Sequence, residues 1–389
     1  MSHLSRLRSE ALNAPASGIV AVMQHAFGRE GVLPMWAGEG DLATPDFVTR
    51  AAAESLAKGE TFYTYQRGLP ELRQALADYT ERLYGRPQSP ERFFVTGSGM
   101  QAIQISIAAL AGAGDEVVYF GPAWPNFAAA AELIGAKAVE VALEPRDGAW
   151  HLDLDRVREA VTEKTRAIFV NTPANPTGWT ATEDEHRAIL DIARETNTAI
   201  IADEIYSRFF YAGTRAPSFH DVMCEDDTIL FVNSFSKNWA MTGWRVGWIE
   251  APAELDEVIA NLIQYSTSGV AVFMQRGALV ALERGEAFVE EQIARAHQAR
   301  NIFSDRLLAT NRVALTPPAG AFYAYFSIDG VADTRAAAFR IVDEAGVGLA
   351  PGTAFGPVGP QFLRACFHRR LDEVEIAADR IAGWIGRTI

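Results

Sequence analysis

Short runs of β-branched and apolar residues alternate with longer helical patterns through most of this chain. From about residue 50 onward the candidate strands are residues 92–96, 116–120, 138–143, 167–171, 199–203, 229–233 and 246–250. Helical patterns such as 100–111 and 183–197 lie between several of them. This alternation is typical of βαβ units, which assemble into a mostly parallel sheet. We therefore expect an α/β fold, with a large domain whose mostly parallel sheet is flanked by helices, plus a smaller α+β domain.

The pattern changes near residue 281, which indicates a second domain. A long helix is predicted over 286–310, a strand-rich segment around 320–328, and an amphipathic helix over 371–386 with Val374, Ile381 and Ile385 on one face. Residues 1–12 are helix-like, with leucines at 4, 7 and 12, and are expected to pack as an arm or as an element of one lobe. Because 389 residues exceed one small domain, we predict an N-terminal arm and part of the small domain at 1–49, a large domain at 50–280 and a small C-terminal domain at 281–389.

The net charge and the number of cysteines exclude several classes of partner and cofactor. The 49 acidic and 35 basic residues give a net charge of −14, which argues against nucleic acid or an anionic membrane as a general partner. Two cysteines, Cys224 and Cys366, exclude a disulfide framework and a thiolate-rich metal site, and no metal is expected. We find neither a signal-peptide pattern nor an apolar run of about 18 residues, so a cytoplasmic location is predicted.

Unusual residues follow five of the predicted strands. The segments that come directly after them are GSGMQA, GPAWPNF, TPANPTG, the DEIY that overlaps strand 199–203, and SFSK. Each has an ordinary structural explanation when taken singly, as a helix cap, a turn or a solvated surface group. In an open α/β sheet, however, the carboxyl ends of the strands share one edge, where ligands bind. We therefore expect these segments to form one site.

The set of side chains suits pyridoxal 5'-phosphate, whose aldehyde forms a Schiff base with a lysine. Lys237 can supply the amine, and Asp203, at the end of a buried strand, can hold the ring nitrogen protonated. Asn175 and Tyr206 can contact the phenolic oxygen, and Trp124 can cover the ring. The phosphate can be bound at a helix start and by neighbouring polar groups, for which the candidates are Ser98, Gly99, Met100, Ser234, Ser236 and Arg245.

Nearly the whole chain resembles a known family, the class I/II aminotransferases of the aspartate aminotransferase superfamily, which are fold type I pyridoxal-phosphate enzymes. The matching segments are GEGDLATPDF (38–47), YTYQRGLPELRQAL (63–76), VTGSGMQAI (95–103), NTPANPTG (171–178), ADEIY (202–206), SFSKNWAMTGWRVGW (234–248), PGTAFG (351–356) and LRACF (363–367). The lysine segment is highly specific, whereas GSG and ADEIY are modest signals alone. The chain departs from the family at Met100 and Gln101, so the phosphate cup there is expected to act through backbone N–H groups.

The resemblance implies further roles. Lys237 would also move the proton between the substrate α-carbon and the cofactor, with Asp203 and Tyr206 as its catalytic partners. Arg364 would bind the substrate α-carboxylate through two parallel hydrogen bonds, a geometry that lysine cannot copy. Gly38, Trp124 and Asn175 would contact the substrate as well. Tyr63 would reach the phosphate of a neighbouring subunit, which implies a homodimer with shared active sites.

The predicted reaction is ping-pong transfer of an amino group from an L-amino acid to a 2-oxo acid. The sequence leaves two alternatives open. A C–S β-lyase would use the same lysine but expel a leaving group, and a ligand-binding regulatory domain would bind without catalysis. The acidic charge and the complete catalytic set weigh against the regulatory domain. The side chain of the amino donor is not identified, although Trp36 and Trp179 are candidates for shaping its pocket.

Overall fold

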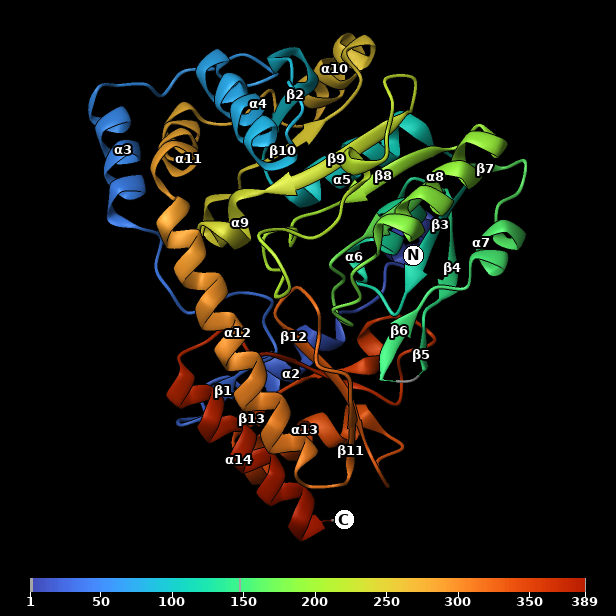
Figure 1. Ribbon diagram of the computed structural model, residues 1–389, viewed down its shortest axis with the longest axis vertical. Coiled ribbons are helices and arrows are strands. Elements are labelled where there is room, and N and C mark those ends of the chain that lie inside the picture. Colours follow the sequence, from blue (N-terminus) through green and yellow to red (C-terminus); the bar gives the residue numbers. More distant parts are fainter. Residues whose placement is uncertain (1–2, 147, 389) are drawn as a thin grey trace.

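A seven-stranded sheet, the large sheet, forms the upper half of the molecule in Figure 1. The computed structural model describes residues 3–146 and 148–388. The large sheet has the order β2-β10-β9-β8-β7-β3-β4, with bounds Phe93–Thr96 (β2), Gly247–Glu250 (β10), Ile229–Ser234 (β9), Ala199–Asp203 (β8), Thr165–Asn171 (β7), Glu116–Gly121 (β3) and Lys137–Ala142 (β4). All seven predicted strands are therefore confirmed, and so is the α/β fold class.

One strand of the large sheet runs against the others. β10 pairs antiparallel with both β2 and β9, and Gly247 at its start lies opposite Thr96 and Ser234 at their ends. The remaining pairs are parallel. Because β10 is reversed, the residues that precede it reach the same edge as the carboxyl ends of its neighbours. Arg245 is thereby brought to the edge where the predicted site lies.

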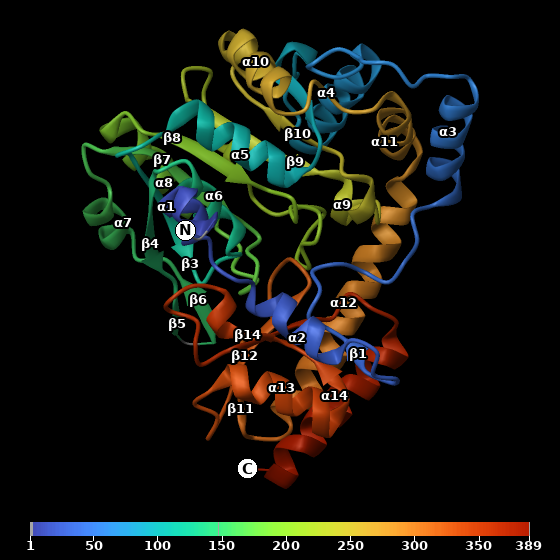
Figure 2. The ribbon, with the colours of Figure 1, turned by 180° about the vertical axis from the view of Figure 1, so that it is seen from behind.

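Helices cover both faces of the large sheet, as Figures 1 and 2 show from opposite sides. Side chains alternate between the faces along each strand: Ile168 and Val170 of β7 pack in one core, and Ala167 and Phe169 in the other. The first core is covered by α7 (Leu154–Ala160) and α8 (Glu183–Thr196), the second by α5 (Gly99–Leu110), α6 (Asn126–Leu133) and α10 (Asp256–Ser266). A short hairpin, β5 (Glu144–Arg146) with β6 (Ala149–His151), lies beside them. Strands buried on both faces explain their continuous apolar sequences.

A smaller antiparallel sheet, the small sheet, forms the lower half. Its order is β11-β12-β15-β14, with bounds Val313–Leu315, Tyr323–Ile328, Leu363–Cys366 and Ala350–Pro351. Helices α2 (Gly18–Ala26), α13 (Thr334–Ala345) and α14 (Leu371–Thr388) pack around it, and α12 (Glu286–Leu308) runs from one half to the other in Figure 1. Val374, Ile381 and Ile385 of α14 are fully buried, as their spacing predicts. A parallel bridge between β1 (Leu33–Pro34) and β13 (Val347–Gly348) ties the N-terminal segment to this half.

The remaining helices lie at the β2 end of the large sheet or in connections. Among the described residues they are α3 (Asp46–Ala57), α4 (Pro70–Tyr84), α9 (Phe235–Asn238) and α11 (Val272–Arg284), with 3-10 turns at Pro90–Arg92, Phe219–Asp221, Thr242–Trp244, Ala253–Leu255 and Gly352–Ala354. No described helix combines the length and apolar character needed to cross a bilayer.

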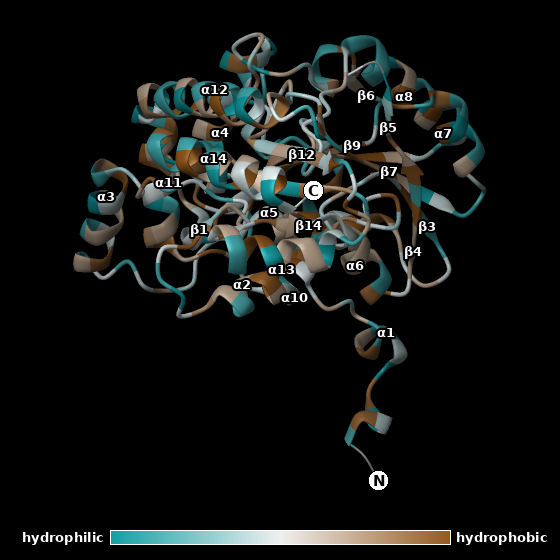
Figure 3. Cartoon of the chain, turned by 90° about the horizontal axis from the view of Figure 1, so that it is seen from below, coloured by the Kyte–Doolittle hydropathy of each residue, from teal (hydrophilic) through white to brown (hydrophobic). Residues whose placement is uncertain are grey.

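The N-terminal segment differs from its sequence pattern. In place of one packed helix, the described part forms two short turns, His3–Arg6 and α1 (Ser9–Leu12). Leu4, Leu7 and Leu12 are each about half exposed, at 60%, 54% and 47%. Figure 3 shows this segment projecting from the rest of the molecule. The helical periodicity of the leucines is real, but four-residue turns are too short to present a continuous apolar face.

Candidate active site

A cavity of about 370 Å³ lies at the carboxyl edge of the large sheet, between it and the small sheet. It brings together every predicted site residue except Ser98 and Tyr63, namely Gly38, Gly99, Met100, Trp124, Asn175, Asp203, Tyr206, Ser234, Ser236, Lys237, Arg245 and Arg364. Most of them follow the carboxyl ends of five strands of the large sheet, whereas Arg245 precedes β10, Arg364 lies in β15 of the small sheet and Gly38 lies between β1 and α3. The convergence of the strand ends on one site is the arrangement that the sequence predicts.

Lys237 lies in α9, the single helical turn that follows β9. Its Nζ donates a hydrogen bond of 2.6 Å to the carbonyl oxygen of Gly38. Burial, together with the positive charges of Arg364 and Arg245, lowers the pKa of Lys237 from 10.5 to about 8. A larger share of this amine is therefore neutral near physiological pH, which is the form that attacks an aldehyde.

Asp203 ends β8 and is 2% exposed. Burial, with a further contribution from the neighbouring Glu204, raises the pKa of Asp203 from 3.8 to about 7. Such a carboxylate is stabilised when a cationic group is placed against it. Tyr206, one turn later, is also buried, and its hydroxyl lies 2.7 Å from the hydroxyl of Tyr323.

The edge around α5 offers a place for an anion. The helix begins at Gly99, so the first backbone N–H groups lack partners within it. Ser98 is the N-cap residue of α5, and its Oγ accepts a hydrogen bond of 3.0 Å from the backbone N–H of Gln101. It does not line the cavity. Across from it, the Ser234 Oγ accepts from the N–H of Ser236 at 3.0 Å.

Arg245 completes this anion site. It has a left-handed backbone (φ 53°), and its Nη1 donates to the carbonyl oxygen of Thr242 at 2.5 Å. A left-handed conformation in a non-glycine residue costs on the order of 1–3 kcal/mol and tends to occur at functional sites. It turns the guanidinium toward the same edge as the start of α5.

Arg364 has a guanidinium that is held in place by other groups of the protein. It is 2% exposed on β15, and its Nη1 donates to the Asn175 side-chain oxygen at 3.0 Å while Nη2 donates to the Trp36 carbonyl oxygen. The guanidinium lies over the rings of Tyr323 and Phe355, at 4.6 and 4.9 Å from their centroids. Its Nε is buried and has no partner. A buried guanidinium with an unsatisfied donor is suited to a carboxylate ligand.

Tyr63 is not brought to this cavity. It is 92% exposed and lines a separate hollow formed by residues 61–64 and 267–271. Its predicted contact across a subunit interface therefore stays a prediction. Trp124, by contrast, is fixed at the cavity by its backbone N–H, which donates to the carbonyl oxygen of Asn175 at 2.9 Å.

Residues 31–381 match the protein family described as aminotransferase class I and II. The chain belongs to this family. It is 31% identical to an aspartate aminotransferase of Pyrococcus horikoshii, over 94% of this chain and 93% of the relative. It is 33% identical to an aromatic-amino-acid aminotransferase of Thermococcus litoralis, over 92% of each. The crystal structure of an aspartate aminotransferase from Thermus thermophilus with maleate superposes with a TM-score of 0.89 at 33% identity, covering 97% of this chain and 99% of that one.

The relatives decide between the enzyme classes considered above. Their names support pyridoxal-phosphate-dependent transamination over β-elimination or a purely regulatory role. The protein is an aminotransferase, and these relatives are named for the amino acids on which they act.

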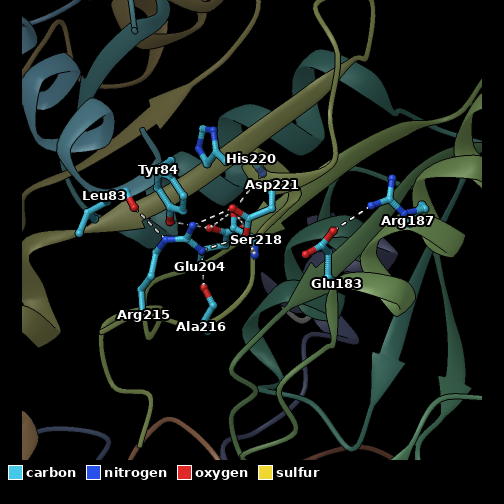
Figure 4. Close-up of polar contacts among 10 residues, drawn as sticks. All are labelled: Leu83, Tyr84, Glu183, Arg187, Glu204, Arg215, Ala216, Ser218, His220 and Asp221. Carbon is cyan, nitrogen blue, oxygen red and sulfur yellow. Dashed lines mark hydrogen bonds and ion pairs between the residues drawn. The ribbon is translucent and has the colours of Figure 1, made fainter. Parts of the chain in front are cut away.

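Glu204 of this aminotransferase follows Asp203 in the sequence but does not line the cavity. Its carboxylate accepts from the Ser218 hydroxyl at 2.7 Å and the Tyr84 hydroxyl at 3.1 Å, as Figure 4 shows. Next to it, Arg215 forms two hydrogen bonds with Asp221, of 2.9 and 2.7 Å. Burial raises the pKa of Glu204. This network fixes the segment that leads from Asp203 at the end of β8 to Tyr206, which is a structural role.

Gln292 of α12 links the two halves of the aminotransferase behind the cavity. Its Nε2 donates to the carbonyl oxygen of Asn238, next to Lys237, at 2.6 Å, and its Oε1 lies 3.1 Å from Nε2 of His368, just after β15. Burial and the nearby Arg295 lower the pKa of His368 to about 3. The ring is therefore neutral, and its Nε2–H can donate to Gln292.

Sequence reasoning missed several residues around the cavity. Tyr323 and Gln292 lie in segments whose patterns indicate only a strand and a helix, so nothing in the sequence distinguishes them from core residues. Trp36 lines the cavity as suggested, whereas Trp179 is 5% exposed and packs edge-on against Phe120. Within residues 3–146 and 148–388 no cluster of His, Cys, Asp or Glu could hold a metal ion.

Proposed function

We propose that this aminotransferase binds pyridoxal 5'-phosphate in the cavity and moves an amino group from an L-amino acid to a 2-oxo acid by a ping-pong mechanism. Three features of the cavity fit this cofactor: the buried Lys237 with a pKa of about 8, the buried Asp203 with a raised pKa, and the anion site around α5 and Arg245. When bound, the cofactor withdraws electrons from the substrate α-carbon. The observation that carries the proposal is that a lysine, a carboxyl group and an unsatisfied arginine face one cavity.

Each side chain then has a defined task. The Lys237 Nζ binds the cofactor and afterwards takes and returns the proton of the substrate α-carbon. Asp203 holds the proton on the ring nitrogen, because its buried carboxylate gains more from a cationic neighbour than from remaining alone. Arg364 orients the substrate through its α-carboxylate, with Asn175 beside it. Gly38 leaves room there, because a Cβ at this position would lie 2.6 Å from the Tyr323 hydroxyl.

The cofactor contacts are proposed in the same way. Tyr206 and Asn175 donate toward the phenolic oxygen, and Trp124 covers the ring. Gly99 and Met100 offer backbone N–H groups to the phosphate, with Ser98 capping the helix behind them and with side-chain donors from Ser234, Ser236 and Arg245.

The test is substitution of the amine. Lys237→Ala should abolish the visible absorption band that the wild-type protein develops with pyridoxal 5'-phosphate, while the far-ultraviolet circular dichroism stays unchanged. Lys164→Ala removes an exposed lysine and serves as the matched control. A folded wild-type protein that develops no such band with the cofactor in excess would refute the proposal.

We also propose a cytoplasmic homodimer in which Tyr63 of one subunit reaches the phosphate bound by the other. The exposed aromatic side chains of Phe62, Tyr63, Tyr65 and Tyr265 support an interface here. Two free cysteines are compatible with a reducing compartment. The domain boundaries at 49/50 and 280/281 remain part of this proposal.

A further inference from the structure

The part of the cavity lining that has no task in the proposed function, called the wall below, is uncharged and mostly apolar. Its apolar members are Ile19 of α2, Trp36, Ala37, Met100, Ile103 and Ile205. Its polar members are the uncharged Asn126, Asn171 and Tyr323, of which Asn171 and Tyr323 already have hydrogen-bond partners in the protein. Arg364, Lys237 and the cofactor occupy the rest of the cavity, so the substrate side chain must contact this wall. Its chemistry can therefore be inferred from this wall.

Every cation that lines the cavity already has a role. Among the residues that the structure describes, the lining contains Lys237, Arg245 and Arg364 and no further lysine, arginine or histidine. The proposed function assigns these three to the cofactor amine site, the phosphate and the α-carboxylate. A second substrate carboxylate would find no positive partner here.

The adjoining cavity does not supply a cation either. A hollow of about 440 Å³ shares Met100, Trp124 and Asn126 with the active site. Its wall is mainly alanine, proline and aromatic residues, its one charged side chain is Glu132, and no described lysine, arginine or histidine lines it. It offers additional room for a bulky apolar group.

The segments around Tyr63 would not bring a positive charge to the active site of a second subunit. Residues 61–66 (TFYTYQ) and 264–271 (QYSTSGVA) contain no lysine, arginine or histidine. They carry the exposed aromatics Phe62, Tyr63, Tyr65 and Tyr265 instead. If they close the active site of a partner, they add aromatic surface.

We propose that the amino donor has an uncharged, apolar or aromatic side chain, in preference to aspartate or glutamate. This inference rests on the proposed function. A side-chain carboxylate placed against Ile19, Trp36 and Met100 would lose its hydration without gaining an ion pair, which is strongly unfavourable. An apolar side chain gains from the same burial. The oxo acid formed from this donor has the same side chain and meets the same wall.

The test compares donors of equal shape. Leucine, asparagine and aspartate branch at the same carbon and differ in the charge and polarity of the branch. Single-turnover loss of the visible absorption band of the holoenzyme gives kcat/KM for each half-reaction, with phenylalanine as a larger apolar donor. Leucine or phenylalanine should exceed aspartate by about 10-fold or more, with asparagine between them. Aspartate reacting as fast as or faster than both apolar donors would overturn the inference.

A binding measurement separates side-chain recognition from chemistry. Succinate and 4-methylpentanoate share a carboxylate and differ in whether the far end is a second carboxylate or an isopropyl group. Calorimetry with the holoenzyme should give about 10-fold or tighter binding of 4-methylpentanoate; tighter binding of succinate would overturn the inference. A holoenzyme that binds these acids but transfers an amino group from no amino acid would contradict the proposed function instead.

A variant tests the wall directly. Ile19→Arg places a cation in it and should raise kcat/KM for aspartate relative to leucine by about 10-fold, while the matched Ile19→Leu leaves the ratio near that of the wild type. An unchanged ratio in a folded Ile19→Arg protein would contradict the placement of the side-chain site at this wall.

Discussion

Asp203 is predicted to destabilise the cofactor-free protein, so Asp203→Asn should make it more stable. A folded-state pKa raised from 3.8 to about 7 means that the folded protein binds this proton more tightly than the unfolded chain. The stability that protonated Asp203 contributes is fully present below pH 3.8 and is lost as the pH rises through about 7. Asparagine keeps the shape and never ionises. At about 1.4 kcal/mol per pKa unit, the variant should gain at most about 4 kcal/mol at pH 8 and about 2 kcal/mol at pH 5.5.

The assay is urea unfolding of the cofactor-free proteins between pH 5.5 and 8.5. Asp227→Asn is the matched control: burial alone would raise the pKa of Asp227, but the hydrogen bonds from Arg194 lower it, so this variant should lose stability at pH 8. Saturating pyridoxal 5'-phosphate should remove the advantage of Asp203→Asn, because a cationic ring nitrogen then stabilises the wild-type carboxylate. A stability difference that does not grow with pH would refute the reasoning.

Three further predictions concern neighbouring residues. Gly247→Ala places a Cβ 2.6 Å from backbone atoms at the start of α5. The variant should therefore lower the free energy of unfolding by about 1–3 kcal/mol and weaken the binding of pyridoxal phosphate in an equilibrium titration. Gly243→Ala, which has open space around its Cβ, should change neither quantity. The rate at which the cofactor-free protein captures pyridoxal phosphate should rise with pH and level off above about 8, the pKa of Lys237; a rise that continues to pH 10 would contradict that pKa. Tyr323→Phe removes the 2.7 Å contact to the Tyr206 hydroxyl but keeps the aromatic ring beneath Arg364. The variant should lower the free energy of unfolding by about 1 kcal/mol. Its affinity for carboxylate ligands, measured by calorimetry, should change little.

The large sheet and its active edge could be predicted because their signals are local. Seven apolar strand sequences, five of them followed by a polar or glycine-rich segment, are enough to bring Asn175, Asp203 and Lys237 to one edge. The reversal of β10 could not be predicted, because the connection from β9, residues 235–246, is long enough to return the chain in either direction. Local periodicity failed at the N-terminus, where Leu4, Leu7 and Leu12 repeat as in a helix but have too little of the molecule to pack against.

Contacts between distant segments could not be predicted from one sequence. The hydroxyl of Tyr323 meets that of Tyr206 across 117 positions, and nothing in an alternating strand pattern marks one tyrosine as facing a cavity. Glu204 shows the same limit, because a carboxylate next to Asp203 looks like a second catalytic acid until its partners Ser218 and Tyr84 are seen. Such roles depend on tertiary packing, which decides the direction that each side chain faces.

The two hydrogen bonds of Gln292 fix a point that belongs to both halves of the molecule. Its side chain holds the peptide next to Lys237 on one side and His368 on the other. If the cavity closes on a substrate while both bonds persist, the separation between Asn238 and His368 changes little, so the two halves would rotate near this point rather than slide past it. The reactive amine would then sit beside the hinge and barely move. The cavity could therefore open to release the product while the amine of Lys237 keeps its position.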